Sequence, residues 1–237
     1  HMDRIIDYFD RGKRIPPVHI DMGIAKFCNI NCVFCYGKFQ TLAHKYIQRD
    51  ALLTTMRQAG EIGVRSIAVV GDGEPTCNPY FYECLDEGKK AGLDLSTSTN
   101  GVLVTENSQR DSILRNCVWM RFCLSAGTRE GYKEIHRADH FDTVVRNVKA
   151  LVKWKEKNNY TCDIGLQAVF VPGVMKREII REAILAVDLG VDYFTIKQCS
   201  LPDDGSSGMY QFALTEYDSP ETQAVLNIAE AQSTKKT

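Results

Sequence analysis

Six short apolar runs alternate with runs of helical periodicity along this chain, and this alternation constrains the fold more than any other feature. Apolar runs of this length are typical of strands buried on both faces, and apolar residues at three- and four-residue steps are typical of amphipathic helices. The pattern predicts an α/β protein with a parallel sheet and helices outside it. Right-handed crossovers would curl such a sheet into an open or partial barrel.

The expected strands span residues 18–22, 65–70, 93–99, 118–124, 161–171 and 192–199. The expected helices span residues 3–12, 48–62, 80–91, 107–116, 143–157, 176–189 and 220–232. Polar residues and glycines gather where the strands end. We therefore expect the functional site at the carboxyl edge of the sheet, as in other α/β barrels.

Three cysteines, Cys28, Cys32 and Cys35, follow the first expected strand at a four-residue and then a three-residue step. Soft thiolates on one short loop favour zinc or an iron–sulfur cluster. Structural zinc takes four ligands, and His44 is the nearest candidate for a fourth. A cubane cluster on three cysteines leaves one iron free. A zinc-stapled binding module without catalysis remains the alternative from another functional class.

The stretch Cys-x3-Cys-x-aromatic-Cys, with Phe34 as the aromatic residue, resembles the signature of the radical S-adenosylmethionine (SAM) superfamily. The resemblance covers roughly residues 18–200 and implies a partial (β/α)6 TIM-like barrel. It also implies a [4Fe–4S] cluster on the three cysteines, with SAM chelating the open iron. One electron would then cleave SAM to methionine and a 5′-deoxyadenosyl radical, which abstracts hydrogen from a substrate.

The stretch Gly71-Asp72-Gly73-Glu74-Pro75 resembles the Gly-Gly-Glu motif of this superfamily, whose backbone binds the SAM amino group, although Asp72 stands where glycine is usual. Ser125 and Arg137 resemble a pair that holds the ribose and carboxylate of SAM, and a guanidinium suits a carboxylate because it binds it bidentately. Ordinary alternatives are an Asn-Gly turn at Asn100, a surface arginine at Arg137 and core packing at Val169. The residues expected to bind SAM are Phe34, Gly71, Gly73, Glu74, Asn100, Ser125, Arg137, Gln167 and Val169.

Lys197 and Cys199 end the last expected strand and share one face of it. We expect them to face the substrate, as a proton donor, a hydrogen-atom donor or a cluster ligand. The alternative for Cys199 is a small buried residue. Cys77 and Cys84 are candidates for a second cluster, whereas core or near-surface thiols are expected at Cys117, Cys123 and Cys162. His136 is expected to be an ordinary, partly buried histidine.

Composition indicates which classes of partner the chain can bind. The formal net charge of −1 indicates no broad attraction to nucleic acid or to an anionic membrane. No run approaches the roughly 20 apolar residues of a membrane span. Nine cysteines in a chain without secretory features predict a cytoplasmic protein in which clustered cysteines bind metal. The resemblance adds a flavodoxin or ferredoxin as the reductant.

Three regions are expected: an N-terminal segment at 1–17, the partial barrel at 18–200, and a loop and helix at 201–237. Relatives of the SPASM or twitch type carry a cysteine-rich C-terminal extension, yet no cysteine follows Cys199. Either the enzyme holds one cluster or the chain lacks that extension, and its abrupt end favours the second. The first substrate class is a peptide or protein, and the second is a sugar, nucleoside or antibiotic precursor. Whether the enzyme is an oxidoreductase, an epimerase or a transferase stays open.

Overall fold

The computed structural model describes residues 2–35, 45–171, 173–199 and 217–233. His44 and the loop at 201–211 lie outside the described residues. The six strands are β1 (His19–Met22), β2 (Ser66–Val69), β3 (Asp94–Thr99), β4 (Cys117–Cys123), β5 (Asp163–Phe170) and β6 (Tyr193–Gln198). The α-helices are α1 (Met2–Phe9), α2 (Arg49–Glu61), α3 (Phe81–Lys90), α4 (Asn107–Asn116), α5 (Arg129–His136), α6 (Phe141–Asn158), α7 (Met175–Leu189) and α9 (Pro220–Ser233).

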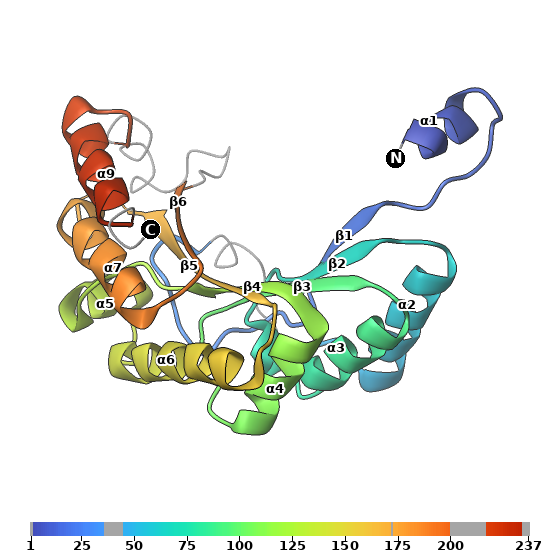
Figure 1. The fold of residues 1–237 in the computed structure, drawn as a ribbon, viewed down its shortest axis with the longest axis horizontal. Coiled ribbons are helices and arrows are strands. Elements are labelled where there is room, and N and C mark those ends of the chain that lie inside the picture. Colours follow the sequence, from blue (N-terminus) through green and yellow to red (C-terminus); the bar gives the residue numbers. More distant parts are fainter. Residues whose placement is uncertain (1, 36–44, 172, 200–216, 234–237) are drawn as a thin grey trace.

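The strands form one parallel sheet in chain order, β1 to β6, and in the described part of the chain β1 and β6 do not pair with each other. Helices α2 to α7 cover one side of this arched sheet, α9 packs beside α7, and α1 projects from the β1 end (Figure 1). Arg4 anchors α1 by donating hydrogen bonds to the carbonyl oxygens of Pro16 and Gly63. The α/β fold class and the open partial barrel predicted from the sequence are confirmed.

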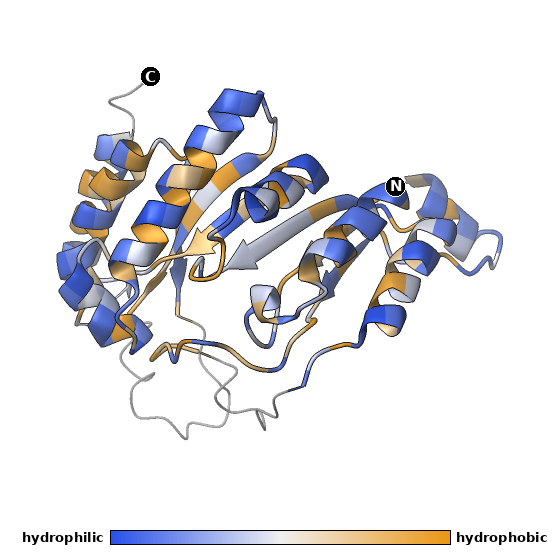
Figure 2. Ribbon diagram, turned by 90° about the horizontal axis from the view of Figure 1, so that it is seen from below, coloured by the Kyte–Doolittle hydropathy of each residue, from blue (hydrophilic) through white to orange (hydrophobic). Residues whose placement is uncertain are grey.

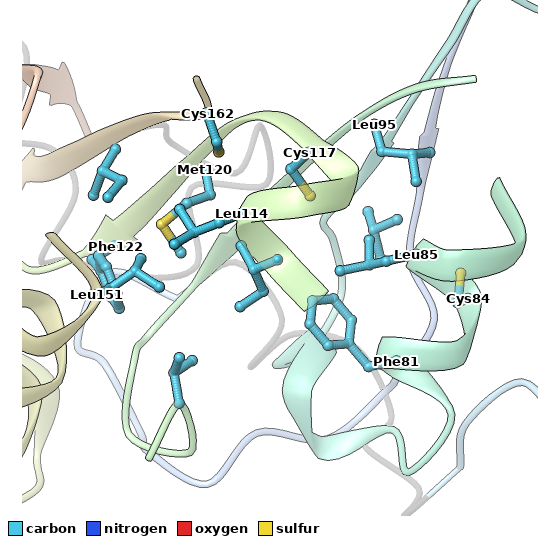
Figure 3. Close-up of a cluster of buried hydrophobic side chains, with 14 of the residues drawn as sticks. Phe81, Cys84, Leu85, Leu95, Leu114, Cys117, Met120, Phe122, Leu151 and Cys162 are labelled. Atoms are coloured by element: carbon cyan, nitrogen blue, oxygen red, sulfur yellow. The ribbon is translucent and has the colours of Figure 1, made fainter. Parts of the chain in front are cut away.

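The main hydrophobic core lies between the sheet and its covering helices. The helices carry hydrophilic bands and hydrophobic bands (Figure 2), as expected for elements that are buried on one side only. Phe81 of α3, Leu114 of α4 and Phe122 of β4 are at most 2% exposed and all belong to this layer (Figure 3). Burying side chains of this size contributes about 1.5–3 kcal/mol each, so the helix-facing residues supply much of the stability of the sheet.

Side chains alternate between the two faces of each strand. In β4, Met120 and Phe122 point into the helix-covered core, so Trp119, Arg121 and Cys123 occupy the opposite side, which we call the inner face. The pairing of β3 with β4 has a register irregularity between Leu95 and Ser96. The inner face is therefore the polar side of the sheet in its central strands.

All six expected strands and all seven expected helices are present, with boundaries that shift by at most three residues. The sequence reasoning missed α5 and the short 3-10 helix at Pro75–Cys77. Helix α5 has only eight residues, too few for a clear apolar period. Its one strong signal is Thr128, whose hydroxyl accepts a hydrogen bond from the Gly131 N–H at 3.1 Å as an N-cap.

Within the described residues, no helix is both long and apolar enough to cross a membrane.

Candidate functional site

The loop that carries the three cysteines follows β1 and is held against the end of α5. The Asn31 N–H donates to the His136 carbonyl oxygen at 3.2 Å, and the Val33 N–H donates to that of Ile135 at 2.8 Å. These two bonds bracket Cys32. The helix missed in the sequence reasoning is therefore the support of the cysteine loop.

The chemistry of the three thiols suits a soft cation or an iron–sulfur cluster. Burial, with the negative charges of Glu74 and Cys35, raises the pKa of Cys28 to about 11. Burial and the neighbouring Cys28 and Cys35 raise the pKa of Cys32 further. Thiols that oppose one another's ionisation become thiolate ligands readily only when a cation binds them. Among the described residues, no group of three His, Cys, Asp or Glu side chains already surrounds a common metal position.

Glu74 ties the end of β2 to the end of β3. Its buried carboxylate accepts hydrogen bonds from the Thr76 N–H (3.1 Å), the Thr76 hydroxyl (2.6 Å), the Thr99 hydroxyl (2.5 Å) and the Asn100 N–H (2.7 Å). Burial raises the pKa of Glu74, and these four donors oppose that rise. The Glu74 N–H also donates to the Phe27 carbonyl oxygen at 2.9 Å. The carboxylate is thus occupied by protein donors and serves to position the two strand ends.

Glycine is required at two positions of this turn. Gly71 has φ +132°, a region that residues with side chains rarely adopt, and packs on the backbone of Gly23. A Cβ atom on Gly73 would lie 2.7 Å from the Phe27 nitrogen. The Gly71–Glu74 turn therefore packs directly on the backbone that leads into the cysteine loop.

Asn100 reaches that loop from the end of β3. Its amide nitrogen Nδ2 lies 2.6 Å from Asn29 Oδ1 and 3.6 Å from Cys28 Sγ. Its Oδ1 accepts a hydrogen bond from the Val102 N–H at 3.1 Å. The side chain thus closes an Asn-Gly turn and contacts the first cysteine at the same time.

His136 contradicts the expectation of an ordinary, partly buried histidine. It is fully buried, and its Nδ1 lies 3.0 Å from Cys32 Sγ. Its Nε2 accepts a hydrogen bond from the Ser125 N–H at 3.0 Å. Burial lowers the pKa of His136 to about 3, so the ring is neutral. The side chain links the end of β4 to the second cysteine.

The other expected SAM residues differ in how close they lie to the cysteine loop. The Ser125 hydroxyl is buried and accepts a hydrogen bond from the Val169 N–H at 3.0 Å. Gln167 faces the same side of the sheet as Cys123, and its buried Oε1 has no hydrogen-bond partner among the described residues. Arg137 is exposed, has φ 52° and ends α5. Its expected contact with a SAM carboxylate stays a prediction.

Lys197 and Cys199, the two residues expected to face the substrate, differ in their exposure to solvent. Cys199 is buried and packs with Phe34 and Val169, so the end of β6 contacts the cysteine loop through an aromatic ring. Lys197 is exposed and pairs in register with Val169. Only Lys197 is therefore solvent-accessible, whereas Cys199 fits the alternative of a small buried residue beside the loop.

The remaining cysteines divide between the core and the site. Cys84, Cys117 and Cys162 are buried in the hydrophobic core (Figure 3), so the suggestion that Cys84 ligates a second cluster is wrong. Cys77 is half-buried in the 3-10 helix, and burial, together with the charges of Glu74 and Cys28, raises its pKa to about 11.

Sequence reasoning missed a set of interacting side chains on the inner face. Cys123 was expected to be a core or near-surface thiol, but its Sγ lies 3.1 Å from the Ser98 hydroxyl on that face. The same hydroxyl accepts a hydrogen bond from Arg121 Nε at 3.1 Å, and the Arg121 guanidinium lies 5.2 Å from the centre of the Trp119 ring. The alternation of Trp119, Arg121 and Cys123 with apolar residues was the available signal.

The chain is similar in sequence to proteins described as probable GTP 3′,8-cyclases. The chain is 25% identical over 215 residues to a probable GTP 3′,8-cyclase of Saccharolobus solfataricus, which covers 90% of this chain and 64% of that protein. It is 26% identical over 151 residues to a probable GTP 3′,8-cyclase of Pyrococcus abyssi, covering 63% of this chain and 47% of that one. The chain thus spans less than two thirds of the length of these relatives.

Two solved structures share the fold. Streptococcus suis SuiB bound to the precursor peptide SuiA superposes with a TM-score of 0.74 at 15% identity, over 99% of this chain and 50% of SuiB. Native anSMEcpe with bound AdoMet superposes with a TM-score of 0.71 at 16% identity, over 91% of this chain and 60% of that one.

The model of the Radical SAM superfamily matches residues 22–181, which include the cysteine loop and strands β2 to β5. Enzymes of this superfamily use a [4Fe–4S] cluster and SAM. The matched segment is more than half of the chain, and its fold agrees with that of the superposed structures. The chain therefore belongs to the radical SAM superfamily of enzymes.

Proposed function

We propose that Cys28, Cys32 and Cys35 hold a [4Fe–4S] cluster at which SAM is reductively cleaved, and that the enzyme removes a hydrogen atom from a peptide or protein substrate. The observation that carries the proposal is the meeting of three strand ends at one loop. Glu74 closes the end of β2, Asn100 reaches the loop from β3, and the end of β4 reaches it through His136. When bound, the cluster and SAM supply the electron and the 5′-deoxyadenosyl radical.

The chain's own residues have separate tasks in this proposal. Gly71, Gly73 and Glu74 hold the backbone that receives the SAM amino group. Ser125 and Arg137 are assigned to the ribose and the carboxylate of SAM, and Asn100 to the ribose. Phe34, Gln167 and Val169 are assigned to the adenosine end, and Lys197 to the substrate side.

A nucleotide or other small anionic molecule is the second candidate substrate, because the inner face presents an unpaired cation. Arg121 has no carboxylate within ion-pair distance among the described residues, and its guanidinium is held by Ser98 and Trp119. A guanidinium fixed in this way can bind a phosphate or carboxylate bidentately. The probable GTP 3′,8-cyclases among the relatives support the nucleotide, and the peptide-bound SuiB structure supports the peptide.

We extend the proposal to the surroundings of the enzyme. The electron comes from a flavodoxin or ferredoxin in the cytoplasm, and no nucleic acid or membrane is involved. Residues 18–200 form the catalytic barrel, with 1–17 preceding it and 201–237 following it.

The first experiment separates the enzyme from a zinc-stapled binding module. Anaerobic reconstitution with iron and sulfide, then dithionite and SAM, should release 5′-deoxyadenosine. Cys32→Ala should abolish both iron binding and this release, because Cys32 is a ligand. Cys84→Ala, a change of the same size in the core, should keep both. A colourless wild type that binds stoichiometric zinc and no iron would contradict the proposal.

The second experiment separates the substrate classes. GTP, or a panel of short synthetic peptides, is added to the reconstituted enzyme, and the release of 5′-deoxyadenosine is followed. Stimulation by a peptide alone supports the first class, and stimulation by GTP alone supports the second. In the second case, Arg121→Gln should weaken GTP binding about tenfold, because a charge-assisted hydrogen bond is worth roughly 1.5–3 kcal/mol.

A further inference from the structure

His136 makes two contacts that fix the position of its only proton. The Ser125 backbone nitrogen lies 3.0 Å from Nε2, and Nδ1 lies 3.0 Å from Cys32 Sγ. A backbone N–H can only donate, so Nε2 must be the acceptor and carries no proton. The proton of a neutral imidazole is then on Nδ1, and it points at the Cys32 sulfur.

The ring cannot easily turn away from this sulfur. Tyr132 packs against it with ring centroids 4.4 Å apart, and Phe34 packs on it edge to face at 5.9 Å. The backbone on either side of Cys32 is bonded to Ile135 and His136. The ring and the cysteine are therefore parts of one tightly connected unit.

We propose that His136 raises the reduction potential of the cluster by donating a hydrogen bond from Nδ1–H to the Cys32 thiolate. The inference rests on the proposed role of Cys32 as a cluster ligand. Reduction adds negative charge to the cluster and its sulfur ligands, and a hydrogen-bond donor stabilises that charge. The Ser125 N–H acts indirectly, because it selects the tautomer that donates, as outer-shell partners of metal-bound residues commonly do. His136 is a positioning and tuning residue and touches no substrate.

The test is an anaerobic redox titration of the reconstituted full chain, followed by electron paramagnetic resonance. His136→Phe keeps an aromatic ring of similar size and removes the donor. We expect its cluster to be harder to reduce, with the ratio of oxidised to reduced cluster at a fixed potential rising about tenfold, or about 59 mV for one electron. Tyr132→Phe is the matched control, since it keeps the stacked ring and changes only a hydroxyl, and its potential should stay unchanged.

A second measurement needs no variant. Wild type labelled with ¹⁵N-histidine should show a weak ¹⁵N coupling in the pulsed spectrum of the reduced cluster, and one exchangeable proton at the cluster should be lost in D2O. A fully loaded His136→Phe cluster with the wild-type potential, or a wild-type cluster without the ¹⁵N coupling, would overturn the inference. A wild type that binds no iron would instead overturn the proposed function.

Discussion

Two buried glutamates of this protein stand in opposite surroundings. Glu74, 3% exposed, accepts four hydrogen bonds at the carboxyl edge of the sheet. Glu182 of α7 is 0% exposed, and neither of its carboxyl oxygens has a hydrogen-bond partner among the described residues. Burial and the nearby carboxylate of Glu178 raise the pKa of Glu182 well above its usual value. The two glutamates are thus both buried but differ in whether their carboxyl oxygens are hydrogen-bonded.

The difference shows that a buried carboxylate can position other elements only when hydrogen-bond donors surround it. The donors of Glu74 come from Thr76, Thr99 and Asn100, so one charge fixes the ends of two strands beside the cysteine loop. Burying an ionised carboxylate without such donors is costly, and the group stays protonated instead. Burial and the nearby Glu178 therefore favour the protonated form of Glu182, whereas the donors around Glu74 let its carboxylate organise the site.

The largest expected effect comes from removing the organised carboxylate. Glu74→Ala leaves two backbone N–H groups and two hydroxyls without their acceptor, which should lower the free energy of unfolding by about 3 kcal/mol or more. Anaerobic urea unfolding measures this loss. SAM cleavage should fall with it, because the ends of β2 and β3 separate. Unchanged stability would mean that the four donors find other partners.

The next largest effect comes from adding a methyl group to the glycine that packs beside each glutamate: Gly73 precedes Glu74, and Gly127 packs against the backbone of Glu182. An added Cβ on Gly73 would collide with the backbone of Phe27, and one on Gly127 would lie 2.5 Å from the Arg181 side chain, next to Glu182. Each alanine variant should lose about 2 kcal/mol through overpacking. Gly73→Ala should also lose iron and SAM cleavage, whereas Gly127→Ala should keep the iron. Equal iron content in both would deny the link between the Gly73 turn and the cysteine loop.

A pH dependence tests the protonated state of Glu182. Its pKa is higher in the folded state than in the unfolded state, so the folded state holds the extra proton and stability is lost as pH rises above about 4.5. The loss is about 1.4 kcal/mol per pH unit until the raised pKa is reached. Glu182→Gln cannot titrate, so the difference in unfolding free energy between this variant and the wild type should shift in favour of the variant as pH rises above about 4.5. A constant difference would show that Glu182 is ionised and paired.

The smallest effect removes one donor from Glu74. Thr99→Val keeps the shape of the side chain and deletes the hydroxyl that bonds Glu74 and that also accepts from the Gly101 N–H. We expect a loss of about 1 kcal/mol in unfolding free energy, because three donors to the carboxylate remain. Thr55→Val on the exposed face of α2 is the control and should change stability less. A loss as large as that of Glu74→Ala would mean that Thr99 alone holds the carboxylate.

Most of the fold could be predicted from the sequence because the signals for strands and helices come from residues that are neighbours in the chain. Strand β5 is buried on both faces and helix α6 on one face, and both are long enough for their apolar pattern to be recognised. Helix α5 was missed because eight residues leave little periodicity, and its place is set by Thr128 and by the loop that packs on its end. Boundaries shifted because helix and strand ends depend on neighbours that a local pattern does not contain.

The candidate site was predictable in part. The cysteine triplet and the Gly71–Glu74 turn are contiguous motifs, so their positions were visible. His136 and Cys123 are single residues whose partners lie 104 and 25 positions away, so no local spacing marked them. Cys84 was a candidate for a second cluster and Cys123 was expected to be a core or near-surface thiol, yet Cys84 is in the core and Cys123 lies on the inner face.

The sequence by itself determined the order of strands and helices and the thiolates available to a cofactor, because both depend on residues that are neighbours in the chain. Only the tertiary structure decided which buried polar groups are satisfied and which are not. It brought His136 to Cys32 and four donors to Glu74, and it left Glu182 without a partner among the described residues. Hydrogen bonds of this kind act over about 3 Å, so they depend on packing between distant segments that no pattern along the chain records.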